Sequence, residues 1–253
     1  MVGKALALLT ELGEYPHGAA ATELSRGLGL PLSTAHRLLG ALVRDGYAGF
    51  DESTKRYTVG LRVFSLAQGI MRAHGLTALA RPILERVSLS TREATLLAVR
   101  DGNRQLYMLS MSGPQQVQVV GEPGRHGPLH VTSQGKVLIG FAPDSARERL
   151  LKDIPLDRFG PKSITNRRKF RQEIERVRSL GYAVADEEHE EGIRAISVPV
   201  FDSDVVVAAL SSAAPAYRRT VAELVTMLPT LRDAADSLSA LVTLQQETRP
   251  TAR

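Results

Sequence analysis

The sequence contains no cysteine, and that absence removes several classes of chemistry at once. Without a thiol the chain can form no disulfide, no thiolate metal site and no cysteine nucleophile. It also lacks an apolar run of the roughly 18 residues that a membrane helix needs, and its N-terminus lacks the apolar core of a signal peptide. We therefore expect a protein of the reducing cytoplasm with no membrane partner.

Signatures of catalysis are missing as well. No serine stands in a nucleophile elbow, no glycine-rich loop has phosphate-binding spacing, and no triad is evident. An enzyme built on the second half of the chain would have to use His130 or His189 as its base. The sequence predicts no catalytic residue, no metal and no cofactor, and an enzyme remains the alternative to a binding function.

Positive charge is in mild excess. The chain has 32 Lys and Arg residues against 27 Asp and Glu residues, a net charge of +5, and its pI is near 9.7. Such a balance permits a polyanionic partner. Residues 1–72 hold eight cations against six anions, a difference of two. The case for nucleic acid must therefore rest on where the charges lie.

Residues 24–44 carry the most informative pattern, two short helices joined by a glycine-containing turn. The second helix is predicted to begin at Pro31, because a first-turn N–H is unpaired in any case. One face of this helix is apolar and consists of Ala35, Leu38, Leu39 and Leu42. The other face is small, polar and cationic, and consists of Ser33, His36, Arg37, Gly40 and Arg44. A helix of this kind suits the DNA major groove, although a solvated helix surface would show the same pattern.

The segments around this pair complete a winged helix-turn-helix over residues 1–60. Helices are predicted at residues 2–12, 21–27 and 31–44, and strands at 47–50 and 57–59 flank a polar turn. We expect Arg37 to grip a base edge with its planar guanidinium. Ser33 and Thr34 would hold phosphate at the helix N-terminus, beside His36. The remaining candidates for backbone or minor-groove contacts are Arg26, Lys55 and Arg56.

Residues 61–74 are predicted to form a linker helix, and residues 75–253 an α+β domain with a largely antiparallel sheet. Leu61, Phe64 and Ile70 are too apolar to face water, which predicts at least a homodimer. In the second domain, strands are expected at residues 93–99, 105–110, 116–120, 182–186, 193–201 and 205–212. A loop is expected at 121–128, and helices at 76–90, 132–141, 145–152, 166–180 and 221–246, the last of them kinked near Pro229.

The order of these pieces resembles the IclR family of bacterial transcriptional regulators over nearly the whole chain. In the first domain the matching motifs are residues 4–9, 29–39 and 57–61. In the second they are residues 127–130, 135–136, 181–182, 186–196 and 198–201. The resemblance implies a DNA-binding winged helix-turn-helix, a linker helix and a GAF-like effector-binding domain. It also implies a dimer or a dimer of dimers on a double-stranded operator.

A turn near residue 132 is the candidate effector site. Thr132 or Ser133 caps a new helix whose free N–H groups favour an anion, although an ordinary helix cap has the same sequence. The resemblance places this turn in the effector pocket, with lining residues Leu129, Thr132, Ser133, Gln134, Glu187, Ile193, Ala195 and Ser211. His130 is expected to hold the loop or line the pocket, and Lys136 to point to solvent or into it.

Two departures from the family pattern bear on the ligand. Ala185 and Ala213 stand where the family can have aspartate and often has serine, so this pocket is less polar. We expect a carboxylate on an apolar or aromatic body rather than a two-carbon acid.

Two charged runs admit alternatives. Residues 186–191 place one histidine among five carboxylates, which suits either a divalent ion or, more commonly, a solvated acidic loop. Residues 158–178 hold eight cations against two glutamates. That segment is either a second DNA-binding patch or the exposed face of a helix at an oligomer contact.

Overall fold

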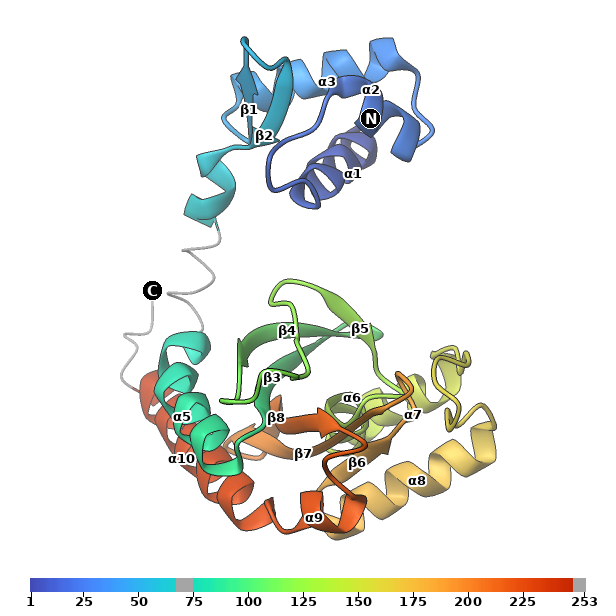
Figure 1. The fold of residues 1–253 in the computed structure, drawn as a ribbon. Helices are drawn as coiled ribbons and strands as arrows, with labels where there is room; N and C mark the ends of the chain where they lie inside the picture. The colour runs from blue at the N-terminus through green and yellow to red at the C-terminus, as the bar shows by residue number, and fades with distance from the viewer. Residues whose placement is uncertain (67–74, 248–253) are drawn as a thin grey trace. The chain divides into compact units, whose positions relative to one another are not determined.

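The computed structural model describes residues 1–66 and 75–247 (Figure 1). The chain divides into two compact units, Met1–His74 and Gly75–Arg253. Within the described residues, no helix is long and apolar enough to cross a membrane.

The first unit is a three-helix core with a two-stranded wing. Helices α1 (Val2–Gly13), α2 (Ala21–Gly27) and α3 (Leu32–Arg44) precede the antiparallel strands β1 (Ala48–Asp51) and β2 (Arg56–Val59). Leu8, Leu24 and Leu39 are fully buried at the centre, one from each helix. Tyr57 of β2 packs its ring 4.6 Å from that of Phe50 of β1, and it is buried in the same apolar cluster as the three helices, which joins the wing to the helical core.

A helix covers residues 61–66 directly after β2. Its apolar side chains Leu61 and Phe64 are 84% and 61% exposed, and Leu66 is exposed as well. The rest of the predicted linker helix, including Ile70, lies outside the described residues.

The second unit is a six-stranded antiparallel sheet covered by helices on both faces. In sheet order the strands are β5 (His126–Pro128), β4 (Arg104–Met111), β3 (Ala94–Asp101), β8 (Val205–Pro215), β7 (Ile193–Asp202) and β6 (Ala183–Asp186). One face is covered by α5 (Leu76–Thr91), α9 (Val221–Val225) and α10 (Leu228–Glu247), and the other by α6 (Ser133–Gly140), α7 (Asp144–Asp153) and α8 (Arg167–Leu180).

Strand alternation divides the side chains between the two faces. Leu97 and Leu210 point into the core beneath α5 and α10, whereas Ala209 belongs to the cluster under α6. The α6 face carries small side chains beyond that cluster, among them Ala195 and Ala213. Because these side chains cannot fill the space above the sheet, a cavity remains there.

Two predicted elements are wrong and one is interrupted. Residues 112–125 contain no strand, and the short strand β5 lies within the predicted loop. Gly121 packs so closely on Leu96 that a Cβ there would stand 2.1 Å from its side chain, so tertiary packing overrides the alternating pattern. The C-terminal helix is broken between α9 and α10, just before Pro229, whose ring cannot continue a helical ladder.

Candidate DNA-binding surface and effector cavity

Helix α3 presents the expected amphipathic division. Ala35, Leu38 and Leu39 are buried. Ser33, His36 and Arg37 are exposed, and Thr34 is half-buried. The helix begins at Leu32 with Pro31 as its N-cap, one residue later than predicted. The outward face therefore offers a hydroxyl, an imidazole and a guanidinium from a helix whose other face is fixed in the core.

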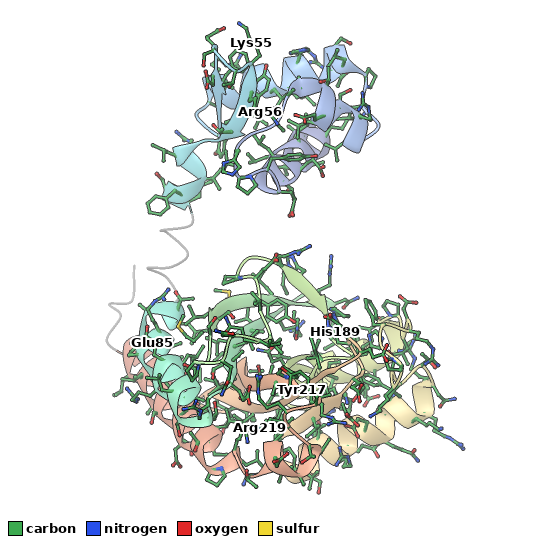
Figure 2. The ribbon with its side chains drawn as sticks, in the orientation of Figure 1. Lys55, Arg56, Glu85, His189, Tyr217 and Arg219 are labelled. Atoms are coloured by element: carbon green, nitrogen blue, oxygen red, sulfur yellow. The ribbon has the colours of Figure 1, made fainter. Side chains whose placement is uncertain are left out.

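The wing places its two cations differently (Figure 2). Asp51 accepts hydrogen bonds from Ser53 and Thr54, which tighten the turn and lower the pKa of Asp51 to about 2. Lys55 is exposed at the tip, where its Nζ lies 2.8 Å from Glu52. Arg56 turns back to the unit, donating from Nε to Gly18 O at 3.1 Å and pairing with Glu23 at 3.1 Å. Arg26 of α2 is exposed.

A cavity of about 840 Å³ lies over the α6 face of the sheet. Seven of the eight predicted effector residues line it, namely Leu129, Thr132, Ser133, Gln134, Ile193, Ala195 and Ser211. Ala185 and Ala213 line it too, so the two departures from the family pattern are part of the wall.

The N-terminus of α6 forms one edge of this cavity. Thr132 is the N-cap, and its Oγ1 accepts a hydrogen bond from Gly135 N at 3.1 Å. A Cβ at Gly135 would lie 2.2 Å from Leu129 O, so only glycine permits this approach. The Ser133 and Gln134 N–H groups stand in the first turn, where helical geometry supplies no carbonyl partner. Ser133 Oγ lies 2.7 Å from Ser197 Oγ, which holds its hydroxyl against the sheet.

Glu187 is the exception, and its predicted place in the pocket is wrong. It is not among the lining residues, because its carboxylate pairs with Lys162 at 2.9 Å and accepts a hydrogen bond from Gly192 N at 3.1 Å. Its backbone φ of +53° turns the segment so that His189 and Glu190 line the cavity instead.

The first half of the acidic run is ion-paired, whereas Glu190 and Glu191 are exposed, as in a solvated loop. Asp186 pairs with Lys162 and Arg194, and Glu188 Oε1 lies 2.6 Å from Lys136 Nζ. Lys136 is only 1% exposed and also contacts Glu173 at 3.2 Å, which excludes the predicted solvent-facing position. In the part of the chain that the structure describes, no group of three His, Cys, Asp or Glu residues could hold a metal ion.

Comparisons with known proteins fit both units. Residues 1–52 match the model of the IclR helix-turn-helix domain, and residues 68–240 match that of the C-terminal domain of the bacterial transcriptional regulator IclR. The chain belongs to the IclR family.

Its relatives are named transcriptional regulators. The chain is 30% identical over 223 residues to the regulator BhcR of Paracoccus denitrificans, covering 88% of this chain and 80% of that protein. It is 28% identical to the repressor AllR of Escherichia coli K12, covering 96% of this chain and 90% of that protein. A solved IclR homologue from Microbacterium hydrocarbonoxydans, complexed with 4-hydroxybenzoate, superposes with a TM-score of 0.81 at 29% identity, covering 95% and 99% of the two chains.

Sequence reasoning missed the aromatic end of the cavity in this IclR-family chain. The Phe159 ring stacks on His189 at 5.7 Å and meets His130 edge-on at 5.8 Å. Burial lowers the pKa of both histidines, and His130 Nε2 bonds to Asp157 O at 2.8 Å. Phe159 lies in the irregular segment between α7 and α8, so no periodic signal could have placed it.

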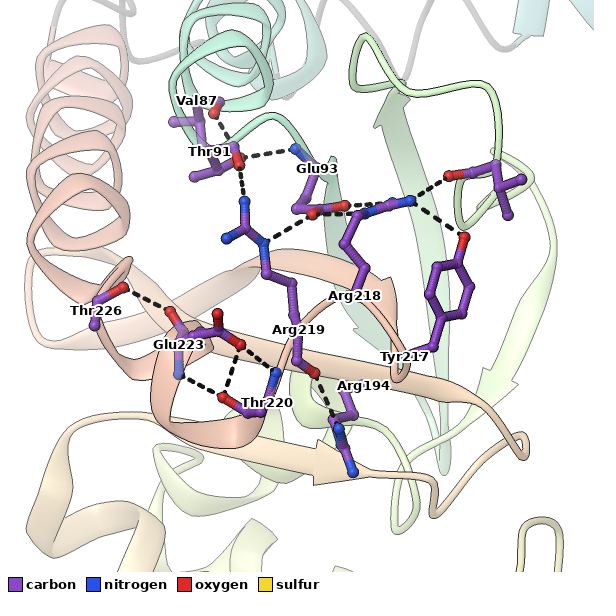
Figure 3. Close-up of polar contacts among 11 residues, drawn as sticks. Val87, Thr91, Glu93, Arg194, Tyr217, Arg218, Arg219, Thr220, Glu223 and Thr226 are labelled. Atoms are coloured by element: carbon purple, nitrogen blue, oxygen red, sulfur yellow. Dashed lines mark hydrogen bonds and ion pairs between the residues drawn. The ribbon is translucent and has the colours of Figure 1, made fainter.

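A second feature that the sequence did not reveal is the ion cluster around Glu93 (Figure 3). Glu93 is 1% exposed and pairs with Arg218 at 2.7 Å and Arg219 at 3.0 Å. Arg218 Nη1 also donates to Val117 O at 3.0 Å. The cluster thus ties the connection between β8 and α9 to residues 112–125, which form part of the cavity wall.

Proposed function

We propose that this regulator binds an operator as a dimer or dimer of dimers and that a small organic acid in the cavity controls the binding. The exposed Ser33, His36 and Arg37 face of α3, on a helix whose opposite face is buried, is the observation that carries the DNA-binding part. The name of each relative as a regulator or repressor supports a binding function rather than catalysis.

On duplex DNA, Arg37 contacts the edge of a base, since two N–H groups of its guanidinium match the two acceptors of guanine. Ser33, Thr34 and His36 contact phosphate or bases near the helix N-terminus. Arg26 and Lys55 meet the backbone or minor groove, because both are exposed. Arg56 joins them only by exchanging its Glu23 partner for a phosphate.

In the cavity, the acid group of the effector lies against the Ser133 and Gln134 N–H groups, where the helix dipole favours negative charge. Ser211 approaches from β8, and Ile193, Ala195 and Ala213 supply an apolar wall. A carboxylate on an apolar or aromatic body fits this lining. The Microbacterium homologue was solved in complex with 4-hydroxybenzoate, which is an aromatic carboxylate of this class.

Control requires a connection between two sites, and we assign it to the linker helix predicted at residues 61–74, between a DNA-binding domain at 1–60 and an effector domain at 75–253. Effector binding changes the spacing of the two DNA-binding domains in the oligomer, and hence their fit to an operator whose half-sites have fixed separation.

The test begins with selection of the operator from genomic fragments, followed by footprinting with a panel of organic acids. We expect a near-palindromic footprint that at least one apolar or aromatic carboxylate strengthens or weakens. If no fragment is enriched over random DNA, the DNA-binding function is wrong. If a footprint appears but no acid in the panel alters it or binds in calorimetry, the effector assignment is wrong.

A further inference from the structure

The excess positive charge of this chain lies in one segment. Residues 144–180, which span α7, α8 and the connection between them, hold eleven Lys and Arg residues against six Asp and Glu residues, a difference of five. Because the whole chain has a net charge of +5, the rest is electrically balanced. A polyanion therefore meets its strongest attraction on α7 and α8.

Some of these cations are used inside the unit. Arg171 pairs with Glu148 at 2.9 Å, which joins α8 to α7, and Arg176 pairs with Glu173 at 2.9 Å. Arg167 is also occupied, because its Nη1 donates to Leu151 O at 3.1 Å and to Ile154 O at 2.7 Å. These bonds hold the C-terminal end of α7 against the N-terminal end of α8.

Besides Arg167, four exposed cations on these two helix ends have no acidic partner among the described residues. We call them the α7–α8 basic surface, and they are Arg149, Lys152, Arg168 and Lys169. Figure 1 shows α7 and α8 together at the border of the unit, on the face of the sheet away from α5 and α10. The surface thus joins the ends of two helices and is open to solvent.

Helix stability does not explain this placement. Asn166 caps α8, with its Oδ1 accepting from Lys169 N at 3.0 Å, so Arg168 and Lys169 are the second and third helical residues. Positive side chains in the first turn oppose the helix dipole, and α8 has no acidic residue there to offset them. The cations lower the stability of the helix on which they stand, which points to a role outside the fold.

We propose that the α7–α8 basic surface contacts the phosphate backbone of DNA and adds sequence-independent affinity to the recognition by α3. The proposal rests on the DNA-binding function proposed above. Duplex DNA is favoured over an acidic protein because the chain already holds DNA, so phosphates have a high effective concentration around the rest of the oligomer. Residues 1–72 have a charge difference of only two, compared with five for residues 144–180.

The decisive variant is the full-length double substitution Arg168→Glu and Lys169→Glu. Its affinity for a 100-base-pair random-sequence duplex is measured over a salt series. We expect the slope of log K against log salt to fall by about 1–2 units, because each phosphate contact contributes about 0.9. We also expect an unchanged or higher melting temperature, because glutamates in the first turn complement the helix dipole. Weaker DNA binding by a helix that is no less stable cannot be attributed to unfolding.

The matched control is Arg81→Glu with Arg86→Glu, which makes the same charge change at exposed positions of α5 on the other face of the sheet. The proposal is overturned if the α8 variant keeps the wild-type slope of log K against log salt, or if both double variants lower that slope equally. It is also overturned if the α8 variant loses binding to polyglutamate but not to DNA, since the partner is then an acidic protein. Arg37→Ala separates the two proposals, because it should lose operator preference yet retain most of the slope on random DNA.

Discussion

At the scale of single residues, Arg37 and Lys55 should fail in different ways when replaced. Arg37→Ala removes a base contact, so it should cost about 1–3 kcal/mol on the operator and relax the preference at one base pair. Lys55→Ala removes a phosphate contact, so it should weaken all sequences alike and reduce the salt slope by about 1. Gel shifts on the operator and on single-base variants measure both. Wild-type affinity and specificity for Arg37→Ala would remove α3 from the interface.

Ser133 offers a comparable test of the cavity. Its side chain is buried against Ser197 at the start of α6, so Ser133→Glu places a negative charge where we assign the effector acid group. The variant should lose the response to organic acids while operator binding persists. Calorimetric titration with the acid panel is the measurement, and Ser133→Ala, which keeps the N–H groups, is the control. Equal binding by wild type and Ser133→Glu would place the ligand elsewhere.

The lowered pKa values of the two cavity histidines determine how the free energy of unfolding should change with pH. Burial holds the pKa of His130 and His189 below the ordinary value of 6.5. At a pH between 6.5 and the lower pKa of the folded protein, the unfolded chain binds more protons than the folded chain. The free energy of unfolding should therefore fall as the pH is lowered through 6.5. The full stabilisation is present above that pH.

Urea unfolding from pH 7.5 to pH 5 measures this effect. His189→Gln should flatten the pH dependence, because it removes one of the two groups whose protonation differs between the folded and unfolded chain. A His189→Gln profile parallel to that of the wild type would contradict the assignment.

At the scale of elements, the Glu93 cluster should govern the attachment of residues 112–125. Replacing both Arg218 and Arg219 by alanine leaves a buried carboxylate without its partners, which typically costs about 3–5 kcal/mol. We expect the lower end of that range, because both arginines are partly exposed. Chemical denaturation gives the loss, and Tyr217→Phe, which removes only a 3.5 Å contact with Arg218, is the control. A loss similar to that of the control would show that the cluster is only a surface feature.

Elements with strong periodicity could be predicted, and those set by long-range packing could not. The α3 face follows from helical spacing, and the α6 start follows from Thr132 and the glycine after it, since both signals are local. Residues 116–120 alternate like a strand, but Gly121 against Leu96 leaves them as an irregular wall of the cavity. Glu187 turns away because Lys162, 25 residues distant, attracts it. No local pattern contains that information.

At the scale of the whole molecule, the helix at residues 61–66 carries the prediction of an oligomer. Leu61 and Phe64 stay in water in a single chain, which is unfavourable for side chains of this size. A second copy would bury them, and two copies would read the two half-sites of a near-palindromic operator. We therefore expect sedimentation at micromolar concentration to show at least a dimer, and Leu61→Glu with Phe64→Glu to shift it toward monomer. Operator binding by that variant should depend on the square of protein concentration, because its dimer forms only on DNA. Leu89→Glu, at another exposed apolar position, should change neither property, and a wild-type protein that sediments only as a 27.4 kDa species would contradict the prediction.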